Sequence, residues 1–83
     1  MKHIIFTIYD SKVESYSPPF YARSVAEGIR TITSTLKNAE SQLSQYPEDF
    51  SLYHIGTFCD ESANIELLEH KSFLGLLSNF APS

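Results

Sequence analysis

The segment from residue 3 to residue 9 alternates with a period of two. Ile4, Phe6 and Ile8 share one face of an extended chain, and the opposite face also holds apolar side chains, at Ile5 and Tyr9. A period of two built from β-branched and aromatic residues is typical of a β-strand. Because both faces are apolar, we expect this strand to be central in a sheet or covered on both sides.

Residues 10–21 follow as a polar stretch that ends near the pair Pro18-Pro19. The residue before a proline is biased toward extended backbone, so this stretch predicts a loop with an extended approach to the prolines. It is long for a connection between a strand and a helix, and loops of this length are often functional.

A helix is predicted to begin after Ser24, because Ser24 and Glu27 have the spacing of a capping box. The apolar residues that follow recur every three or four positions, which makes one helical stripe. Its members are Val25, Ile29, Ile32 and Leu36. We expect the helix to end near Asn38 and residues 39–45 to add a further helical turn.

Residues 51–58 and 65–68 both have strand character, and the polar residues 59–64 between them predict the turn of an antiparallel hairpin. Simple alternation over the first of these strands places Tyr53 on one face. It places Leu52 and Phe58 together on the other.

The tail, residues 70–83, is too apolar to be free in solvent. Its large apolar residues are Phe73, Leu74, Leu76, Leu77 and Phe80. We expect a short helix or an extended arm, docked on its own subunit or on a neighbour.

These elements predict an α+β fold in β-α-β-β order, with a small antiparallel sheet and one main helix packed on one face. We interpret residues 1–83 as a single domain, with a core over about 2–69 and the apolar tail at 70–83. The second sheet face would then be bare and would expose Ile5 and Tyr9. Exposed apolar patches usually mark an interface, so we expect a homodimer.

The composition is that of a small folded domain with a thin core. The 83 residues are 42% hydrophobic, which is enough for a core but makes a thin one. The single cysteine, Cys59, excludes an internal disulfide and fits a reducing compartment. No apolar stretch is long enough for a membrane span or a signal peptide, so we expect no membrane partner and a cytoplasmic location.

No motif in the sequence predicts catalysis or a bound metal. The three glycines are scattered, and no closely spaced metal-ligand pair occurs. His3, His54 and Cys59 could be imagined as a zinc set, but solvated histidines are the better interpretation. We expect Asp60 and Glu61 to raise the pKa of Cys59, which argues against a nucleophile. We therefore predict no enzymatic activity and no cofactor.

The segment from Tyr9 to Arg30 has the composition of a nucleic-acid site. It interleaves aromatic residues with cations, and exposed aromatics that stack on bases beside cations that meet phosphates are what single-stranded DNA binding uses. The candidate binding residues, with Lys2 entering the same sheet, are Lys2, Tyr9, Lys12, Tyr16, Phe20, Tyr21, Arg23 and Arg30. The alternative interpretation is a purely structural role, in which Phe20 and Tyr21 are packing anchors before the helix and the cations lie on a solvated face.

Several motifs occur in an order that resembles a known family. They are Ile8 to Lys12, Tyr16, Pro19-Phe20, Ala26 to Arg30, Tyr46 to Tyr53 and Ile55-Gly56. Together, over about residues 4–70, they resemble the small nonstructural protein of gokushovirus-type microviruses, which are phages with single-stranded DNA genomes. The resemblance implies a DNA-binding protein of the infected host's cytoplasm with a role in genome replication or packaging. It implies no set of binding residues.

Two functions therefore remain open. The first is an accessory protein that binds DNA as a dimer, with single-stranded DNA as the leading candidate ligand. The second is an adaptor that contacts a host or phage protein through its apolar sheet face, acidic turns and tail. The net charge of −4 is unusual for a strong DNA binder, because such proteins normally carry an excess of Lys and Arg.

Overall fold

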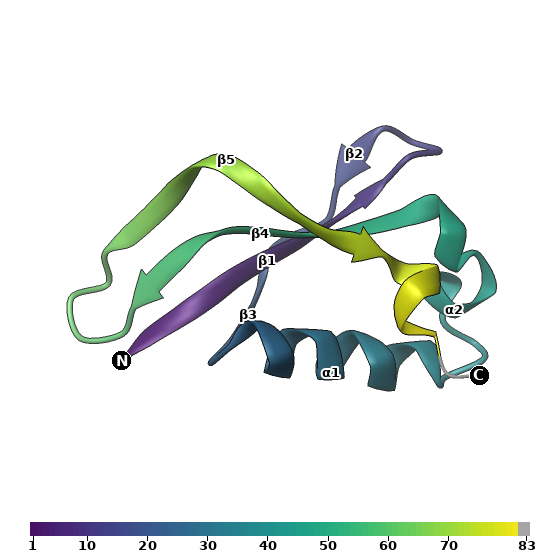
Figure 1. Ribbon diagram of the computed structural model, residues 1–83, viewed down its shortest axis with the longest axis horizontal. Coiled ribbons are helices and arrows are strands. Elements are labelled where there is room, and N and C mark those ends of the chain that lie inside the picture. Colours follow the sequence, from purple (N-terminus) through teal and green to yellow (C-terminus); the bar gives the residue numbers. More distant parts are fainter. Residues whose placement is uncertain (82–83) are drawn as a thin grey trace.

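A computed structural model describes residues 1–81 and has the predicted α+β fold, a five-stranded antiparallel sheet with one main helix beneath it (Figure 1). The strands are β1 (Lys2–Asp10), β2 (Ser15–Tyr16), β3 (Phe20–Ala22), β4 (Phe50–Cys59) and β5 (Ile65–Leu76). The helices are α1 (Val25–Leu36), the short α2 (Gln42–Gln45), and the 3₁₀ turns η1 (Pro47–Asp49) and η2 (Leu77–Phe80).

The sheet has the order β2-β1-β4-β5, and β3 pairs with β1 on the same edge as β2. The first strand is therefore central, as its two apolar faces predict. The predicted loop over residues 10–21 is partly wrong, because it contains both short strands β2 and β3. These two strands use the hydrogen-bonding groups along the edge of β1 that β4 leaves free.

The apolar tail completes the core of its own subunit. Strand β5 extends to Leu76, well beyond the predicted end at residue 68, and η2 follows it. Leu77 is fully buried beside Phe6 and Leu52, which are also inaccessible to solvent. The tail is therefore extended strand followed by a short 3₁₀ helix, docked on its own subunit, which is one of the predicted alternatives. The last two residues of the predicted domain, 82 and 83, lie outside the described part of the chain.

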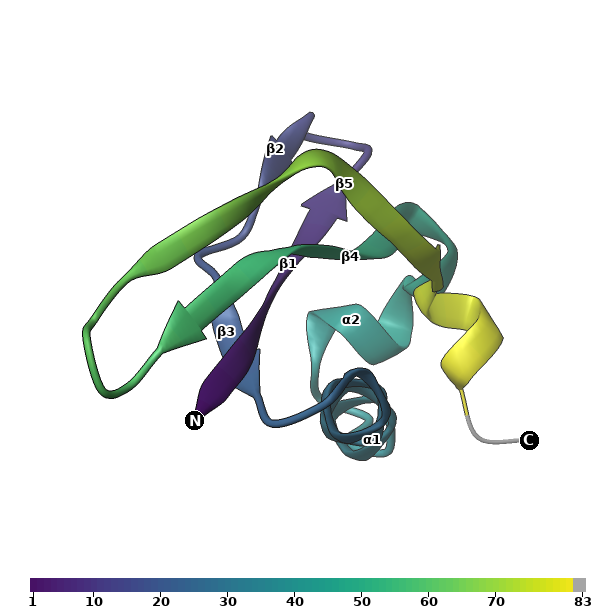
Figure 2. The same cartoon turned by 60° about the vertical axis from the view of Figure 1, so that its left-hand side comes forward.

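Helix α1 begins and packs as its sequence predicts. The Ser24 hydroxyl accepts a hydrogen bond from the Glu27 amide, and the Glu27 side chain reaches back to the amide of Arg23. The predicted stripe faces the sheet, with Ile32 and Leu36 buried in the core. Figure 2, which shows α1 end-on, places the helix beneath the sheet, on one face only.

Strand β4 contains one residue more than its neighbour β1 requires. Phe6 pairs with His54 and Ile5 pairs with Gly56, so Ile55 is an extra residue that forms a β-bulge. The bulge changes which side chains share a face: Gly56 and Phe58 lie with Tyr53, and not with Leu52. The prediction that placed Leu52 and Phe58 together is therefore wrong.

Strand β5 contains a much larger irregularity opposite the same bulge. His54 pairs with Ser72 and Gly56 pairs with Leu67, so the four residues 68–71 of β5 lie opposite the single residue Ile55. Strand β5 consequently arches away from β4 near its middle, as Figure 1 shows. We call residues 68–71 the β5 arch.

The sheet face opposite α1 is not bare at its centre. Ile5 is only 3% exposed and Thr7 only 4%, although both point away from the helix. The expectation that Ile5 would be exposed is thus wrong. On the same face the Thr7 hydroxyl donates a hydrogen bond to the carbonyl oxygen of Ser17, in the segment between β2 and β3. Within residues 1–81, no helix is long and apolar enough to cross a membrane.

The contact between Phe6 and Gly28 yields the first testable prediction. A Cβ atom at residue 28 would lie 2.3 Å from Cζ of the buried Phe6 ring, which cannot move aside. Replacing glycine by alanine in a helix normally stabilises by about 1 kcal/mol, whereas overpacking a core costs about 1–3 kcal/mol. We expect packing to dominate, so Gly28→Ala should lower the free energy of unfolding by about 1 kcal/mol in urea titrations.

A double-mutant cycle checks the cause of that loss. Phe6→Leu alone should destabilise by removing buried surface, but in the Gly28→Ala background its cost should shrink, because the shorter side chain leaves room for the new methyl group. Strictly additive effects would show that the Phe6 ring is not what excludes a side chain at residue 28.

Candidate nucleic-acid interface

The sheet face opposite α1, here called the outer face, is defined by strand register. It contains His3, Ile5, Thr7 and Tyr9 of β1 and the residues that pair with them on β2, β3 and β4. It also contains the residues of β5 that pair with those β4 residues. The other strands contribute Tyr16, Tyr21, Ser51, Tyr53, Gly56, Phe58, Ile65, Leu67, Phe73 and Leu76. No carboxylate occurs among these paired positions, which are mainly aromatic and aliphatic.

Four aromatic rings from four strands form a continuous row on the outer face. The ring centroids of Tyr9 and Tyr16 are 4.7 Å apart, those of Tyr16 and Tyr53 are 6.0 Å apart, and those of Tyr53 and Phe73 are 5.6 Å apart. All three distances lie in the range of favourable aromatic pairs. Tyr16 is 47% exposed and Phe73 58% exposed, so the aromatic row offers ring surface to solvent.

Lys71, from the β5 arch, lies above the middle of the aromatic row. Its ammonium group is 5.7 Å from the Tyr16 ring centroid and 5.8 Å from that of Tyr53, which is cation–π distance. Strands β2 and β5 are three positions apart in the sheet, or about 14 Å if the sheet were flat. The contact between Lys71 and Tyr16 therefore joins the two edges of the sheet across the outer face.

A second group of aromatic side chains lies at the other end of the outer face. The Phe58 ring is 6.0 Å from the Tyr21 ring and 6.2 Å from the His3 ring, measured between centroids. Together with Ile65 these residues line an open, largely apolar pocket of about 360 Å³, here called the His3 pocket.

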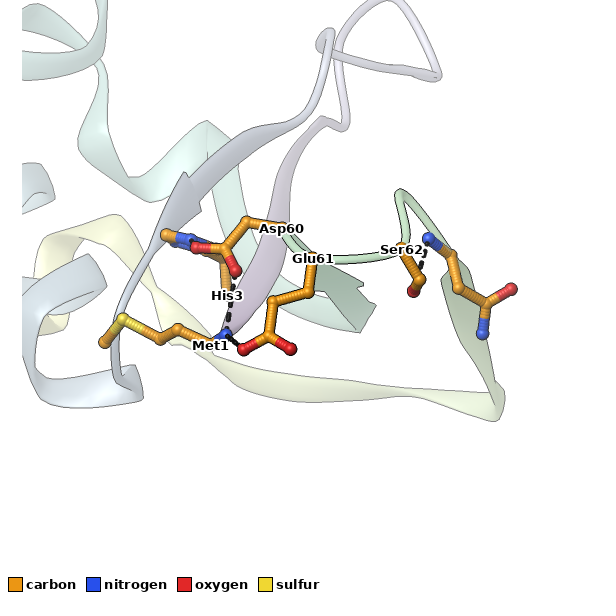
Figure 3. A network of polar contacts seen from close by, with 6 residues as sticks. Met1, His3, Asp60, Glu61 and Ser62 are labelled. Carbon is orange, nitrogen blue, oxygen red and sulfur yellow. Dashed lines mark hydrogen bonds and ion pairs between the residues drawn. The ribbon is translucent and has the colours of Figure 1, made fainter.

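A small polar network borders the His3 pocket (Figure 3). The amino group of Met1 lies 2.7 Å from Oδ1 of Asp60 and 3.4 Å from a carboxylate oxygen of Glu61. The His3 ring shares a 2.9 Å hydrogen bond with the other oxygen of Asp60. The hydrogen bonds from the Met1 amino group and from His3 lower the pKa of Asp60, and the hydrogen bond to Asp60 raises the pKa of the Met1 amino group.

Cys59 lies beside this network, and its pKa is lower than that of an ordinary thiol. The cause is hydrogen bonding from the Ser62 side chain and from the backbone of Glu61 and Ser62. The expectation that neighbouring carboxylates would raise this pKa is wrong, because the hydrogen bonds to the thiolate outweigh the effect of burial, and the Met1 amino group lowers the pKa further. Within residues 1–81, no three His, Cys, Asp or Glu side chains are grouped as metal ligands.

The structure brings together only some of the residues that the sequence suggested for a binding site. Tyr9 and Tyr16 lie in the aromatic row, and Tyr21 lies in the His3 pocket. Phe20 lies on the helix side, where its ring stacks on Phe6 at 5.2 Å. It therefore packs the core, as the alternative interpretation of this aromatic residue proposed.

The candidate cations are spread over three parts of the molecule. Lys2 begins β1 and Arg23 follows β3, so both lie at the end of the sheet that holds the His3 pocket. Lys12 lies in the turn between β1 and β2, where it lines a shallow hollow together with Tyr46 and Asp49. Arg30 is exposed on α1, in the layer beneath the sheet, and cannot share a surface with the outer face.

Sequence reasoning missed half of the aromatic surface. Tyr53, Phe58, Phe73 and Lys71 were not proposed as site residues, although all four lie on or over the outer face. Alternation in β4 and β5 would have grouped Tyr53 and Phe73 with the first strand's outer residues. The β-bulge at Ile55 and the β5 arch hide the contributions of Phe58 and Lys71, because neither irregularity has a clear sequence signature.

A family model described as "Phage ORF5 protein" matches residues 3–80, nearly the whole chain. No curated protein and no solved structure matches the chain significantly.

The Asp60 network predicts a loss of stability in acid. The lowered pKa of Asp60 in the folded state means that its contribution is present above the unfolded pKa of about 4 and disappears as pH falls through the folded pKa. Asp60→Asn should therefore lower the midpoint of thermal unfolding at pH 7 and bring it level with the wild type at about pH 2–3. A difference that persists unchanged into acid would show that the Asp60 carboxylate does not act through its charge.

Proposed function

The chain belongs to the Phage ORF5 protein family, and from this premise we propose that it is a phage accessory protein that binds single-stranded DNA on the outer face of its sheet. Bases stack on the aromatic row, and Lys71, Lys12 and other cations at the rim meet phosphates. The observation that supports this proposal best is the aromatic row itself, four exposed or half-exposed rings from four strands with an ammonium group above them.

The acidic net charge is compatible with this proposal because none of the 10 Asp and Glu side chains is at a paired position of the outer face. Asp60 and Glu61 border the His3 pocket, and Glu69 lies in the β5 arch. Glu27, Glu40, Glu48 and Asp49 belong to the helical layer and its turns. The net negative charge of the protein repels DNA weakly, but the aromatic row has no carboxylate at its paired positions. Stacking on the rings, rather than neutralisation of phosphates, therefore supplies most of the affinity.

Lys71 does not block the aromatic row. An exposed cation–π contact is worth about 0.5–1 kcal/mol, whereas stacking one base on an aromatic side chain is worth about 1–3 kcal/mol. A base that enters the row therefore displaces the ammonium group at small cost. The displaced Lys71 is then placed to meet the phosphate next to that base, which replaces the lost contact.

The ordered resemblance to the small nonstructural protein of gokushovirus-type microviruses supports a more specific role. A phage with a single-stranded genome must hold that genome unpaired during replication and packaging in the host cytoplasm. A small protein with a stacking surface and few phosphate contacts suits transient cover of such DNA. We propose that this protein acts there by binding and not by catalysis.

Substitutions in the aromatic row test the proposal. Tyr16→Ala and Phe73→Ala should each weaken binding of labelled oligothymidylate by about 1–3 kcal/mol, or roughly five- to more than a hundredfold, in fluorescence anisotropy titrations at low salt. Tyr46→Ala is the matched control, because Tyr46 is 52% exposed but lies between α2 and η1, away from the outer face. Equal losses of affinity in all three variants, or no binding of the wild type at about 100 μM protein, would contradict the proposal.

Lys71→Gln separates charge from stacking. Each phosphate contact on a single strand contributes about 0.7 to the slope of log affinity against log salt, so this variant should bind with a slope shallower by roughly that amount. A slope that does not change would remove Lys71 from the binding surface.

A second candidate function, self-association or adaptor binding, rests on the exposed apolar side chains of β5. Leu67 is 71% exposed and Ile65 53% exposed, and both lie where β4 and β5 extend beyond the helical layer (Figure 1). Small domains with thin cores often oligomerise. We propose that these residues join two copies in a homodimer or contact a phage or host protein. Leu77 has no part in such a surface, because it is fully buried.

Leu67→Glu tests the dimer. If two copies associate through β5, light scattering should show about 19 kDa for the wild type, twice the chain mass of 9.4 kDa, and a monomer for the variant. The variant should remain folded, because the Leu67 side chain is mostly exposed and contributes little buried surface to the fold. A wild type that is monomeric at micromolar concentration would exclude the homodimer.

A further inference from the structure

The His3 pocket and the aromatic row lie at opposite ends of one face. Tyr9 belongs to the row and His3 to the pocket, and they are six positions apart on β1, which is about 20 Å of strand. Between them, Ile5 and Thr7 are buried and expose no charge. A single extended ligand can therefore follow β1 from one aromatic group to the other without meeting a carboxylate of that strand.

The shape of the His3 pocket suits a small flat group. Its aromatic walls, Tyr21 and Phe58, come from β3 and β4 and meet at 59°, so they form an open wedge rather than a closed stack. Tyr21 is 51% exposed and presents one side of its ring to the solvent. A volume of about 360 Å³ is near the lower limit for small-molecule sites, which favours a single planar ring system over a larger ligand.

One exposed cation lies at the end of β3, next to the His3 pocket. Arg23 follows Ala22, whose partner on β1 is Ile4, whereas Lys2 alternates with His3 and points to the other side of the sheet. The nearby carboxylates of Asp60 and Glu61 are both paired with the Met1 amino group. Their repulsion of an approaching phosphate is thereby reduced.

We propose that the His3 pocket holds one base of the same DNA strand that lies on the aromatic row. The pocket is thus a second base site on the outer face, with Arg23 meeting a phosphate beside that base. This inference rests on the proposed function and adds a length requirement. At the duplex rise of about 3.4 Å per nucleotide, roughly six nucleotide steps span the 20 Å between the two sites, and a more extended single strand needs fewer. Strands too short to span this distance occupy one site at a time.

Length-dependent binding tests the two-site arrangement. The full-length wild-type chain should bind an oligothymidylate of about ten nucleotides at least tenfold more tightly than one of about three, because only the longer strand reaches both sites. Tyr21→Ala should remove most of this gain and Tyr21→Phe should keep it, since Phe retains the stacking ring. If Tyr21→Ala leaves the length dependence unchanged, the pocket is not a base site.

Methyl and aromatic NMR spectra of the same chain give a readout that does not depend on a variant's folding. Addition of the longer oligonucleotide should shift the Ile65 methyl signals and the Phe58 ring signals together with those of Tyr16 and Tyr53. Shifts confined to Tyr16 and Tyr53 would overturn the pocket inference and leave the proposed function standing. If neither group shifts and no binding is seen at about 100 μM, the proposed function fails and this inference fails with it.

Discussion

The unequal lengths of β4 and β5 control the shape of the outer face. One residue of β4, Ile55, lies opposite four residues of β5, and strands can accommodate such a difference only by bending. The His54 side chain spans the bulge and donates a hydrogen bond to the carbonyl oxygen of Gly56, 3.1 Å away, which supplies a partner within the irregular segment. The one-residue bulge of β4 against β1 turns Phe58 toward the outer face, and the arch of β5 carries Lys71 over the rings of Tyr16 and Tyr53.

The bend also requires two strands to approach closely at Gly56. A Cβ atom at residue 56 would lie 2.4 Å from the carbonyl oxygen of Glu66 in the β5 backbone, so any larger residue would force the strands apart. Beneath the sheet the constraint is similar, because Phe6 occupies the space that a side chain at residue 28 would need. Two of the three glycines thus allow close packing on opposite sides of the sheet, which is how a thin core can fix the positions of both layers.

The sequence was informative where local chemistry decides the structure, and less so where distant segments decide it. The first strand, the capped start of α1 and its buried stripe follow from period and capping, and all three are present in the structure. Strands β2 and β3 were hidden because two or three residues cannot show a period, and they exist only since β1 offers them an edge. The same limit applies to the site. Tyr9 and Tyr16 could be proposed from composition, but Tyr53 is brought beside them by its pairing with Thr7, 46 positions away. Phe73 and Lys71 follow through the pairing of β5 with β4, where Phe73 lies 20 positions from its partner Tyr53.

The central pairing of β1 with β4 has a consequence for how the chain reaches this structure. The paired residues range from Asp10 with Phe50, 40 positions apart, to Lys2 with Cys59, 57 positions apart. Closing loops of that length loses chain entropy before any contact compensates for it, and proteins dominated by such contacts fold slowly for their size. On the ribosome, β1 must wait until residue 59 has emerged. Until then only its short partners β2 and β3 can protect its apolar edge, so the newly made chain depends on them to avoid aggregation.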